Sequence, residues 1–331
     1  MFLGIDTSNY TTSCALYDKE QGVVVQEKQL LPVKAGELGL RQSEALFHHT
    51  VRLPALLKAL FGDSPAHIDG IGVSGRPRSA EGSYMPCFLA GVSAAEAVGA
   101  ALGLTVRHFS HQEGHIAAAL FSCGRLDLLQ EPFLAFHVSG GTTEMLLVNP
   151  VADSADSDAA AVLPVRRIGG SADLHAGQLV DRVGKALGLP FPAGAALDAL
   201  AVSYRNEQGE TRPAPLRIKV QEGTCSLSGA ENQCAARKQE GRPDGEIALA
   251  CLGGIGNALT DMAAFALREY GTLPLLFSGG VACSAVIRGI LRRAYPDALF
   301  AAPVFSADNA AGTAILASAD FLLPSIPMKS P

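Results

Sequence analysis

The feature that most restricts the fold of this chain is an internal repeat. Residues 2–12 and 133–143 align without a gap at a constant offset of 131 residues. Phe, Leu, Ser, Thr and Thr coincide in the two copies, and Leu16 falls on Leu147. Each copy reads as a short apolar run, a small polar turn and a returning strand, which is typical of a β-hairpin. Two unrelated hairpins can match by chance, but the unbroken register favours a duplicated domain with two similar halves around a cleft.

Turns of small residues accompany this repeat. The segment 139–141 (Ser-Gly-Gly) joins the two strands of the second copy, and 278–280 (Ser-Gly-Gly) follows an apolar run at 273–277. Because glycine has no side chain, backbone N–H groups in such turns can approach a phosphate or a ribose closely. The turn at 139–141 alone could be an ordinary tight hairpin turn. With the corresponding turn of the first copy at residues 6–9 (Asp-Thr-Ser-Asn), these turns predict a nucleotide site to which both halves contribute.

A pair of histidines is the second feature. His111 and His115 stand in the segment 110–115 (Ser-His-Gln-Glu-Gly-His), ahead of an alanine-rich run that predicts a helix. Residues four apart on a helix have Cβ atoms about 5–6 Å apart, so two neutral imidazoles can bind one divalent cation if a third ligand joins them. The alternative is a pair of surface histidines. Glu113 lies about 200° around the helix from each histidine, which argues against a zinc peptidase, whose glutamate shares a face with a histidine.

Asp308 is a candidate third ligand. It stands just before the helix expected at residues 310–322. At that place it could equally be the N-cap of the helix, with no further role.

The composition restricts the class of protein. The chain of 331 residues is 48% hydrophobic and 18% charged, which suits two well-packed α/β domains. Its net charge of −6 gives no overall positive field for nucleic acid. An RNA contact would need a local cluster such as Arg76 with Arg78, Arg166-Arg167 or Arg292-Arg293, and each of these could be solvated surface. Seven cysteines without a C-x-x-C pair indicate reduced thiols, and no targeting segment or membrane span is expected.

The apolar pattern predicts further elements. Helices are expected at residues 43–61, 86–102, 173–187 and 245–270, and strands at 2–5, 12–17, 23–30, 68–73, 105–107 and 273–277. Residues 151–163 and 324–331 are expected to be a surface loop and a frayed tail. Residues 204–244 are polar and are expected to form loops and short elements.

Several motifs, in this order, resemble those of a known family. They are Gly4-Ile5-Asp6-Thr7-Ser8, His111 to His115, Val138-Ser139-Gly140-Gly141, Gly177 to Asp181, Leu187-Gly188-Leu189 with Pro192 and Gly194, Gly279-Gly280-Val281, and Asp308-Asn309. The family is TsaD, which makes threonylcarbamoyladenosine in tRNA and was once described as an O-sialoglycoprotein endopeptidase of the peptidase M22 type. The resemblance covers about residues 1–320.

The resemblance implies the actin-like, hexokinase-like ATPase fold, an α/β fold with two ribonuclease H-like halves around a nucleotide cleft. The expected domains are residues 1–109, then 110–323 with helical insertions at about 174–270, then a tail at 324–331. The implied activity is acyl transfer: a threonylcarbamoyl group passes from its adenylate to N6 of an adenosine in tRNA.

The resemblance also implies a set of site residues. His111, His115 and Asp308 would bind one divalent metal ion, iron or zinc. Contacts to ATP or the acyl-adenylate would come from Ser139, Gly140, Gly141, Asp181, Gly194, Gly279, Gly280 and Ser284. No catalytic base is identified. Implied partners are tRNA, a shorter paralogue of the same fold and a small ATPase, in the cytoplasm.

Several positions depart from the family pattern. Tyr10 and Thr11 replace adjacent acidic residues, and Ser110 replaces a histidine. Thr142, Glu231 and Ser284 replace a histidine, a lysine and an asparagine. These changes predict a divergent paralogue and leave two alternatives: a related carbamoyltransferase with a small acceptor, or a nucleotide-binding protein without catalysis.

Overall fold

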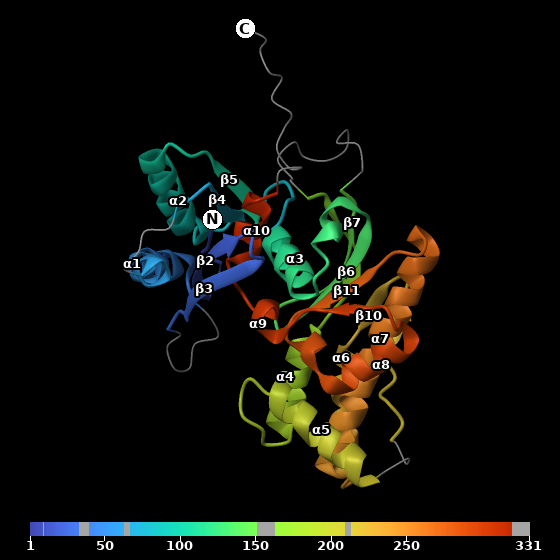
Figure 1. The fold of residues 1–331 in the computed structure, drawn as a ribbon. Coiled ribbons are helices and arrows are strands. Elements are labelled where there is room, and N and C mark those ends of the chain that lie inside the picture. Colours follow the sequence, from blue (N-terminus) through green and yellow to red (C-terminus); the bar gives the residue numbers. More distant parts are fainter. Residues whose placement is uncertain (9, 33–39, 63–66, 151–162, 209–212, 320–331) are drawn as a thin grey trace. The chain divides into compact units, whose positions relative to one another are not determined.

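The computed structural model describes residues 1–8, 10–32, 40–62, 67–150, 163–208 and 213–319. They form two compact units (Figure 1). Unit 1 comprises residues 1–129, 152–164 and 308–331, and unit 2 comprises 130–151 and 165–307. The helix at 111–122 belongs to unit 1, so the units do not divide after residue 109. The loop expected at 151–163 and the tail at 324–331 lie almost wholly outside the described residues.

Unit 1 is built on a five-stranded sheet in the order β3-β2-β1-β4-β5. The strands are β1 (Phe2–Asp6), β2 (Thr11–Asp18), β3 (Val23–Leu30), β4 (Gly70–Arg76) and β5 (Val106–Ser110). β2 runs antiparallel to β1 and β3, whereas β4 runs parallel to β1 and β5. Its helices are α1 (Gln42–Phe61), α2 (Phe88–Leu102), α3 (His111–Ser122) and α10 (Ala311–Ala317), and a 3-10 helix at Leu126–Gln130 leads into unit 2.

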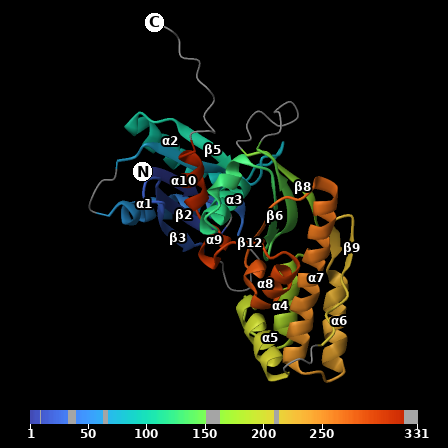
Figure 2. The same ribbon diagram turned by 45° about the vertical axis from the view of Figure 1, so that its right-hand side comes forward.

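Unit 2 repeats this arrangement in a seven-stranded sheet, β12-β11-β6-β7-β8-β10-β9. The strands are β6 (Phe133–Val138), β7 (Thr143–Val148), β8 (Val165–Ser171), β9 (Lys219–Gln221), β10 (Thr224–Ser226), β11 (Leu275–Ser278) and β12 (Leu299–Phe300). Its helices are α4 (Ala176–Ala186), α5 (Gly194–Gln208), α6 (Ser228–Gln239), α7 (Asp244–Tyr270), α8 (Ala285–Ala294) and α9 (Pro303–Ser306), with a 3-10 turn at Val281–Cys283. Both α5 and α6 contact α7 (Figure 2).

The predicted repeat is present in the strand pairing itself. In unit 1, Phe2 pairs with Tyr17, and in unit 2 Phe133 pairs with Val148, so both partners are displaced by the same 131 residues. In both sheets a three-stranded antiparallel part, β3-β2-β1 or β8-β7-β6, continues into two parallel strands, β4-β5 or β11-β12. The shared register and strand order confirm two similar halves.

Glycines let α10 pack closely on the sheet of unit 1. A Cβ on Gly4 would lie 2.4 Å from the carbonyl oxygen of Ala310, and one on Gly72 would lie 2.3 Å from that of Thr313. Such distances are shorter than any real Cβ contact, so the helix rests on bare strand backbone. This packing brings Asp308, just ahead of α10, to the unit that carries the two histidines.

The helix α6 was not predicted, because residues 204–244 were expected to be mainly loops. Only Ala230 and Cys234 of α6 are buried. Two small residues give too weak an apolar periodicity for a helix to be recognised in a polar segment. The β9–β10 hairpin and the last turn of α5 also lie in this region.

The long helix α7 was predicted correctly. It is long and apolar enough to cross a membrane by length and composition, and among the described residues it alone passes that test. However, 78% of its most apolar window is buried within the protein, which is typical of the central helix of a folded core. The cysteines are all free thiols, as expected.

Candidate metal centre and nucleotide pocket

The start of α3 is fixed by a capping box. Ser110 Oγ accepts a hydrogen bond from the Glu113 N–H at 3.2 Å, and the Ser110 N–H donates to Glu113 Oε2 at 2.6 Å. Glu113 is fully buried and also accepts from Ser79 Oγ at 2.8 Å and the Leu163 N–H at 2.8 Å. The carboxylate therefore satisfies donors at the helix start, a role that has nothing to do with peptide hydrolysis.

The two histidines and Asp308 come together in unit 1. His111 Nε2 and His115 Nε2 are 2.9 Å apart, and Asp308 Oδ1 lies 3.5 Å and 3.4 Å from them. One ligand atom from each of the three residues lies within 4.8 Å of the others. The side chains are 19%, 12% and 31% exposed, so the centre is open on one side. Two imidazole nitrogens and a carboxylate oxygen suit iron or zinc.

A fourth residue, Asp6, holds the ring of His111. Asp6 Oδ2 lies 2.8 Å from His111 Nδ1, and Asp6 Oδ1 accepts the Ser8 N–H at 2.9 Å. Asp6 is only 1% exposed. A carboxylate on one ring nitrogen directs the other toward the metal position, as in many protein metal sites. The sequence interpretation missed this role of Asp6.

Charges in this centre shift the pKa values of its groups. Burial alone would lower the pKa of His111, but Asp6 and Asp308 outweigh it and raise that pKa to about 10. For Asp308 the effects have the opposite sign: burial alone would raise its pKa, but hydrogen bonds and charge from His111 and His115 hold that pKa well below its usual range. Without a metal, His111 therefore carries a proton that a metal ion must displace.

Thr11, one of the positions that depart from the family, contacts this centre. Its Oγ1 donates a hydrogen bond to Asp308 Oδ2 at 3.3 Å. The hydroxyl orients the carboxylate, whereas an acidic residue at this position would repel it. The substitution is therefore compatible with the ligand cluster.

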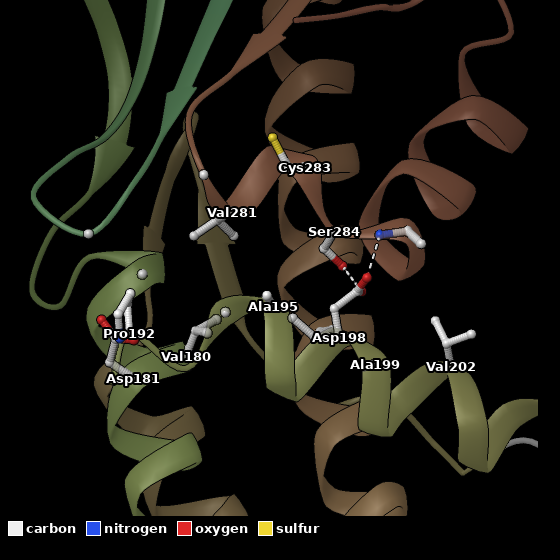
Figure 3. A pocket seen from close by; sticks show the side chains of 16 residues that line it. Val180, Asp181, Pro192, Ala195, Asp198, Ala199, Val202, Val281, Cys283 and Ser284 are labelled. Atoms are coloured by element: carbon white, nitrogen blue, oxygen red, sulfur yellow. Dashed lines mark hydrogen bonds between the residues drawn. The ribbon is translucent and has the colours of Figure 1, made fainter. Parts of the chain in front are cut away.

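Unit 2 contains a pocket of about 710 Å³ (Figure 3). It is lined by Gly140, Gly177, Val180, Asp181, Pro192, Gly194, Ala195, Asp198, Ala199, Val202, Leu252, Gly280, Val281, Cys283, Ser284 and Ala285. Five of the predicted nucleotide contacts are in this lining: Gly140, Asp181, Gly194, Gly280 and Ser284. Apolar side chains form most of the rest. A concave apolar surface with a few polar groups is typical of a site for a small molecule.

The other three predicted contacts, Ser139, Gly141 and Gly279, are not in this lining. The Ser139 N–H donates to the Thr142 carbonyl at 2.7 Å, and the Ser139 carbonyl accepts from the Gly177 N–H at 3.1 Å. Gly279 has a φ of +93°, and a Cβ there would lie 2.3 Å from the Val138 carbonyl oxygen. Ser139 and Gly279 therefore hold the turns in place.

Glycine is also required where α4 meets the first of these turns. A Cβ on Gly177 would lie 2.5 Å from the Cα of Gly140. The start of α4 can approach the turn only because Gly177 lacks a side chain. This contact fixes the wall of the pocket.

Two carboxylates of the pocket are engaged with backbone groups. Asp181 Oδ1 accepts the Ala193 N–H at 2.8 Å. Asp198 Oδ1 accepts the Ser284 hydroxyl at 2.5 Å, and its Oδ2 accepts the Ala285 N–H at 3.0 Å (Figure 3). Asp198 thus caps the start of α8 from the neighbouring helix α5. The sequence interpretation missed Asp198, because its partners lie 86 and 87 residues away.

The remaining departures from the family also have structural partners. Glu231 forms an ion pair with Arg182 at 2.9 Å, and Ser110 is the N-cap described above. Thr142 contributes its backbone carbonyl, which closes the turn at Ser139 and would do so with any side chain. These substitutions are accommodated within the fold.

The family model described as "TsaD: tRNA N6-adenosine threonylcarbamoyltransferase" matches residues 33–315. A tRNA N6-adenosine threonylcarbamoyltransferase from Sulfurihydrogenibium sp. is 30% identical over 292 residues, covering 86% of this chain and 80% of the relative. The protein of the same name from Sorangium cellulosum is 29% identical over 329 residues, covering 93% and 88%.

Solved structures share the fold at low sequence identity. Xylulose kinase from Rhodospirillum rubrum has a TM-score of 0.56 at 15% identity, over 96% of this chain and 89% of the kinase. Full-length HypF in its phosphate- and nucleotide-bound form has a TM-score of 0.55 at 12% identity, over 94% of this chain and 45% of HypF. The activator of 2-hydroxyisocaproyl-CoA dehydratase from Clostridium difficile has a TM-score of 0.51 at 12% identity, over 96% of this chain and 94% of the activator. The chain therefore has the predicted actin-like ATPase fold.

Proposed function

Because the chain belongs to the TsaD family of tRNA N6-adenosine threonylcarbamoyltransferases, we propose that it transfers a threonylcarbamoyl group from an adenylate to N6 of an adenosine in tRNA. The observation that carries this proposal is the cluster of His111, His115 and Asp308, which could hold a metal ion. A bare nucleotide-binding protein would need no such cluster.

The metal centre would bind the threonyl end of the adenylate. A divalent ion, iron or zinc, would attract the carboxylate and hydroxyl of that end as a Lewis acid. Among the residues of the chain, Asp6 would keep Nε2 of His111 directed at the ion, and Thr11 would keep Asp308 in place. These contacts restrict the orientation of the acyl group before any bond changes.

The pocket of unit 2 would bind the adenosine end. Its apolar wall, which includes Val180, Val202 and Val281, suits the base. Gly140 and Gly280 offer bare backbone to the ribose and phosphate, since a Cβ on either would meet no protein atom within 4 Å. The carboxylate of Asp181 would accept hydrogen bonds from hydroxyl groups of the sugar, while Asp198 holds the start of α8 that forms one wall.

The chemical step forms one bond and breaks one bond. The N6 amine attacks the carbonyl carbon of the mixed anhydride, the bond from that carbon to the phosphate oxygen breaks, and AMP leaves. The amine loses one proton, for which the leaving phosphate or water is the acceptor. Positioning and charge stabilisation would supply the catalysis. We expect a slow enzyme, because Tyr10 and Thr11 stand where the family carries adjacent acidic residues.

The decisive assay supplies the adenylate, metal ion and unmodified tRNA in the presence of candidate partner subunits, a shorter paralogue of the same fold and a small ATPase. We expect threonylcarbamoyladenosine in the tRNA with the native chain and none with His115→Ala. In cells, deletion of the gene should remove the modified nucleoside, as measured by mass spectrometry of tRNA digests.

Two results would replace the proposal. Consumption of carbamoyl phosphate and ATP with a small hydroxylated acceptor, without tRNA modification, would indicate the related carbamoyltransferase. Nucleotide binding without transfer to any acceptor would indicate a paralogue that lacks catalysis. A cytoplasmic location is part of the proposal, since the acceptor tRNA is there.

A further inference from the structure

The loop between β4 and α2, residues 77–87, is attached at its first end to the start of α3. The Gln112 N–H donates to the Pro77 carbonyl at 3.1 Å, and Ser79 Oγ donates to Glu113 Oε2 at 2.8 Å. Gln112 directly follows the metal-ligand candidate His111. The loop therefore begins against the helix turn that carries the metal centre.

The second end of the loop lies on another side of the same centre. Thr7 Oγ1 donates to the Cys87 carbonyl at 3.0 Å, which ties the loop to the residue after Asp6. The next residue, Phe88, places its ring centroid 6.2 Å from that of His111. Both ends of the loop are therefore attached to residues that neighbour the candidate metal ligands.

Between these attachments the loop exposes a guanidinium and an aromatic ring. Arg78 is exposed and Tyr84 is 62% exposed. The Arg78 N–H donates to Ser83 Oγ at 3.0 Å, which closes the loop on itself. Glu81, also exposed, is the opposing charge in this loop. Met85, next to Tyr84, packs instead against a buried cluster that includes Phe88.

This combination suits RNA. A chain of net charge −6 must attract a polyanion through local cations. A guanidinium can pair with a phosphate, and an exposed aromatic ring can stack on an unpaired base. The exposed ring of Tyr84 is the apolar surface that such stacking would cover.

We propose that the β4–α2 loop binds the acceptor RNA, with Arg78 on a backbone phosphate and Tyr84 stacked on an unpaired base beside the metal centre. This inference rests on the proposed function, because it requires an RNA acceptor. It adds a binding surface separate from the metal ligands and from the pocket of unit 2.

The test measures binding of unmodified tRNA to the full chain, alone and with the candidate partner subunits, over a series of salt concentrations. Arg78→Gln should weaken binding and reduce the salt slope by about one, the loss of one phosphate contact. Tyr84→Leu should weaken binding by about 5- to 150-fold, the range for one stacked base. Glu81→Gln should tighten binding, because it removes a repulsive charge.

Matched variants separate these roles from folding. Tyr84→Phe keeps the ring and Arg78→Lys keeps the charge, so both should bind nearly as well as the native chain. Lys219→Gln, on β9 of unit 2, removes an exposed charge elsewhere and should change nothing. Metal content should be equal in all of these variants.

The outcomes distinguish this inference from the proposed function. If the native chain binds and modifies tRNA but Arg78→Gln and Tyr84→Leu bind equally well, the loop is not the RNA surface and the proposed function stands. If those variants bind tRNA normally but lose a partner subunit, the loop is a protein interface instead. If the native chain binds no RNA in any of these conditions, both proposals are overturned.

Discussion

The candidate metal centre of unit 1 and the pocket of unit 2 belong to the two similar halves of the molecule but are built by opposite means. The metal centre is a set of charged groups, each held by another: Asp6 on His111, and Thr11 on Asp308. The pocket is mainly apolar, and its shape depends on glycines at its turns. One site depends on the direction of a few polar atoms and the other on the absence of side chains.

This difference predicts different sensitivities. In the metal centre, removing one oxygen or nitrogen should cost affinity while the backbone stays in place. In the pocket, adding carbon atoms should be the damaging change, and exchanging one small apolar residue for another should matter little. The following experiments test this contrast.

The largest effect is expected from His115→Ala. The variant loses one of the three candidate ligands. Its metal affinity should therefore fall by more than about 100-fold, the upper end of what is lost when a residue that only orients a ligand is changed. Metal content measured by elemental analysis of purified protein should drop from about one equivalent to near zero. Binding of AMP, which lacks the threonyl end, to the pocket of unit 2 should be retained, and loss of metal and AMP binding together would contradict two independent sites.

Gly280→Val should abolish nucleotide binding without unfolding the protein. A Cβ at Gly280 meets no protein atom within 4 Å, so the new side chain would occupy the pocket itself. In the native chain, AMP at 100 times its Kd should stabilise the fold by about 2.7 kcal/mol, observed as a higher melting temperature.

Gly289→Val provides the matched control. Gly289 lies on α8, also has open space at its Cβ, and does not line the pocket. Its variant should keep the ligand-induced shift in melting temperature. An unchanged shift in Gly280→Val would place the nucleotide elsewhere.

Asp6→Asn should weaken metal binding by about 10- to 100-fold, an intermediate effect. The amide is nearly the same size, but it has one acceptor oxygen in place of two. It cannot accept from both the Ser8 N–H and His111 Nδ1, so the imidazole ring is held less firmly. Competition with a chelator of known affinity would measure the change. The pocket ligand should bind as before, and native metal affinity would show that the ring is held by packing alone.

The smallest effect concerns a carboxylate of unit 2 outside the pocket. Asp173 accepts hydrogen bonds from Ser228 Oγ at 2.6 Å and from the Leu227 N–H at 2.8 Å. Although burial opposes it, these bonds hold the pKa of Asp173 below its ordinary value. A depressed pKa gives stability that is present above the unfolded value of about 3.9 and is lost as the pH falls further.

Asp173→Asn should therefore lower the free energy of unfolding at neutral pH by about 1 kcal/mol, a modest figure because the exposed carboxylate is screened by water. The difference from the native chain should shrink as the pH falls below about 4. Urea unfolding at several pH values would measure it. A difference that is independent of pH would mean that the carboxylate charge contributes nothing.

Much of this molecule could be predicted from local patterns. The repeat at 131 residues anticipated the shared register of β1–β2 and β6–β7, because a constant offset in sequence preserves strand pairing. The pair His111 and His115 followed from helical spacing alone. Asp308 was placed with them by family resemblance, since nothing local distinguishes it from a helix cap.

The residues that were missed hold their partners across long sequence separations. Asp6 lies 105 residues from His111, and Asp198 lies 86 residues from Ser284. A carboxylate that follows a strand or stands on a helix looks the same in sequence whether it faces water or a distant donor. The polar helix α6 was missed for the related reason that its stability comes from packing in three dimensions, with little apolar pattern of its own.

The discontinuity of unit 1 has a consequence for how the protein is made. Unit 2 is synthesised after the first strands of unit 1 and before α10. At elongation rates of about 5–20 residues per second, those strands therefore wait roughly tens of seconds after their own synthesis until α10 is made. Until then Gly4 and Gly72 present an uncovered backbone surface, and the third candidate ligand, Asp308, has not been synthesised. A chain truncated before Asp308 could neither cover that surface nor complete the ligand set, so uptake of a metal ion would mark those chains whose translation had passed α10.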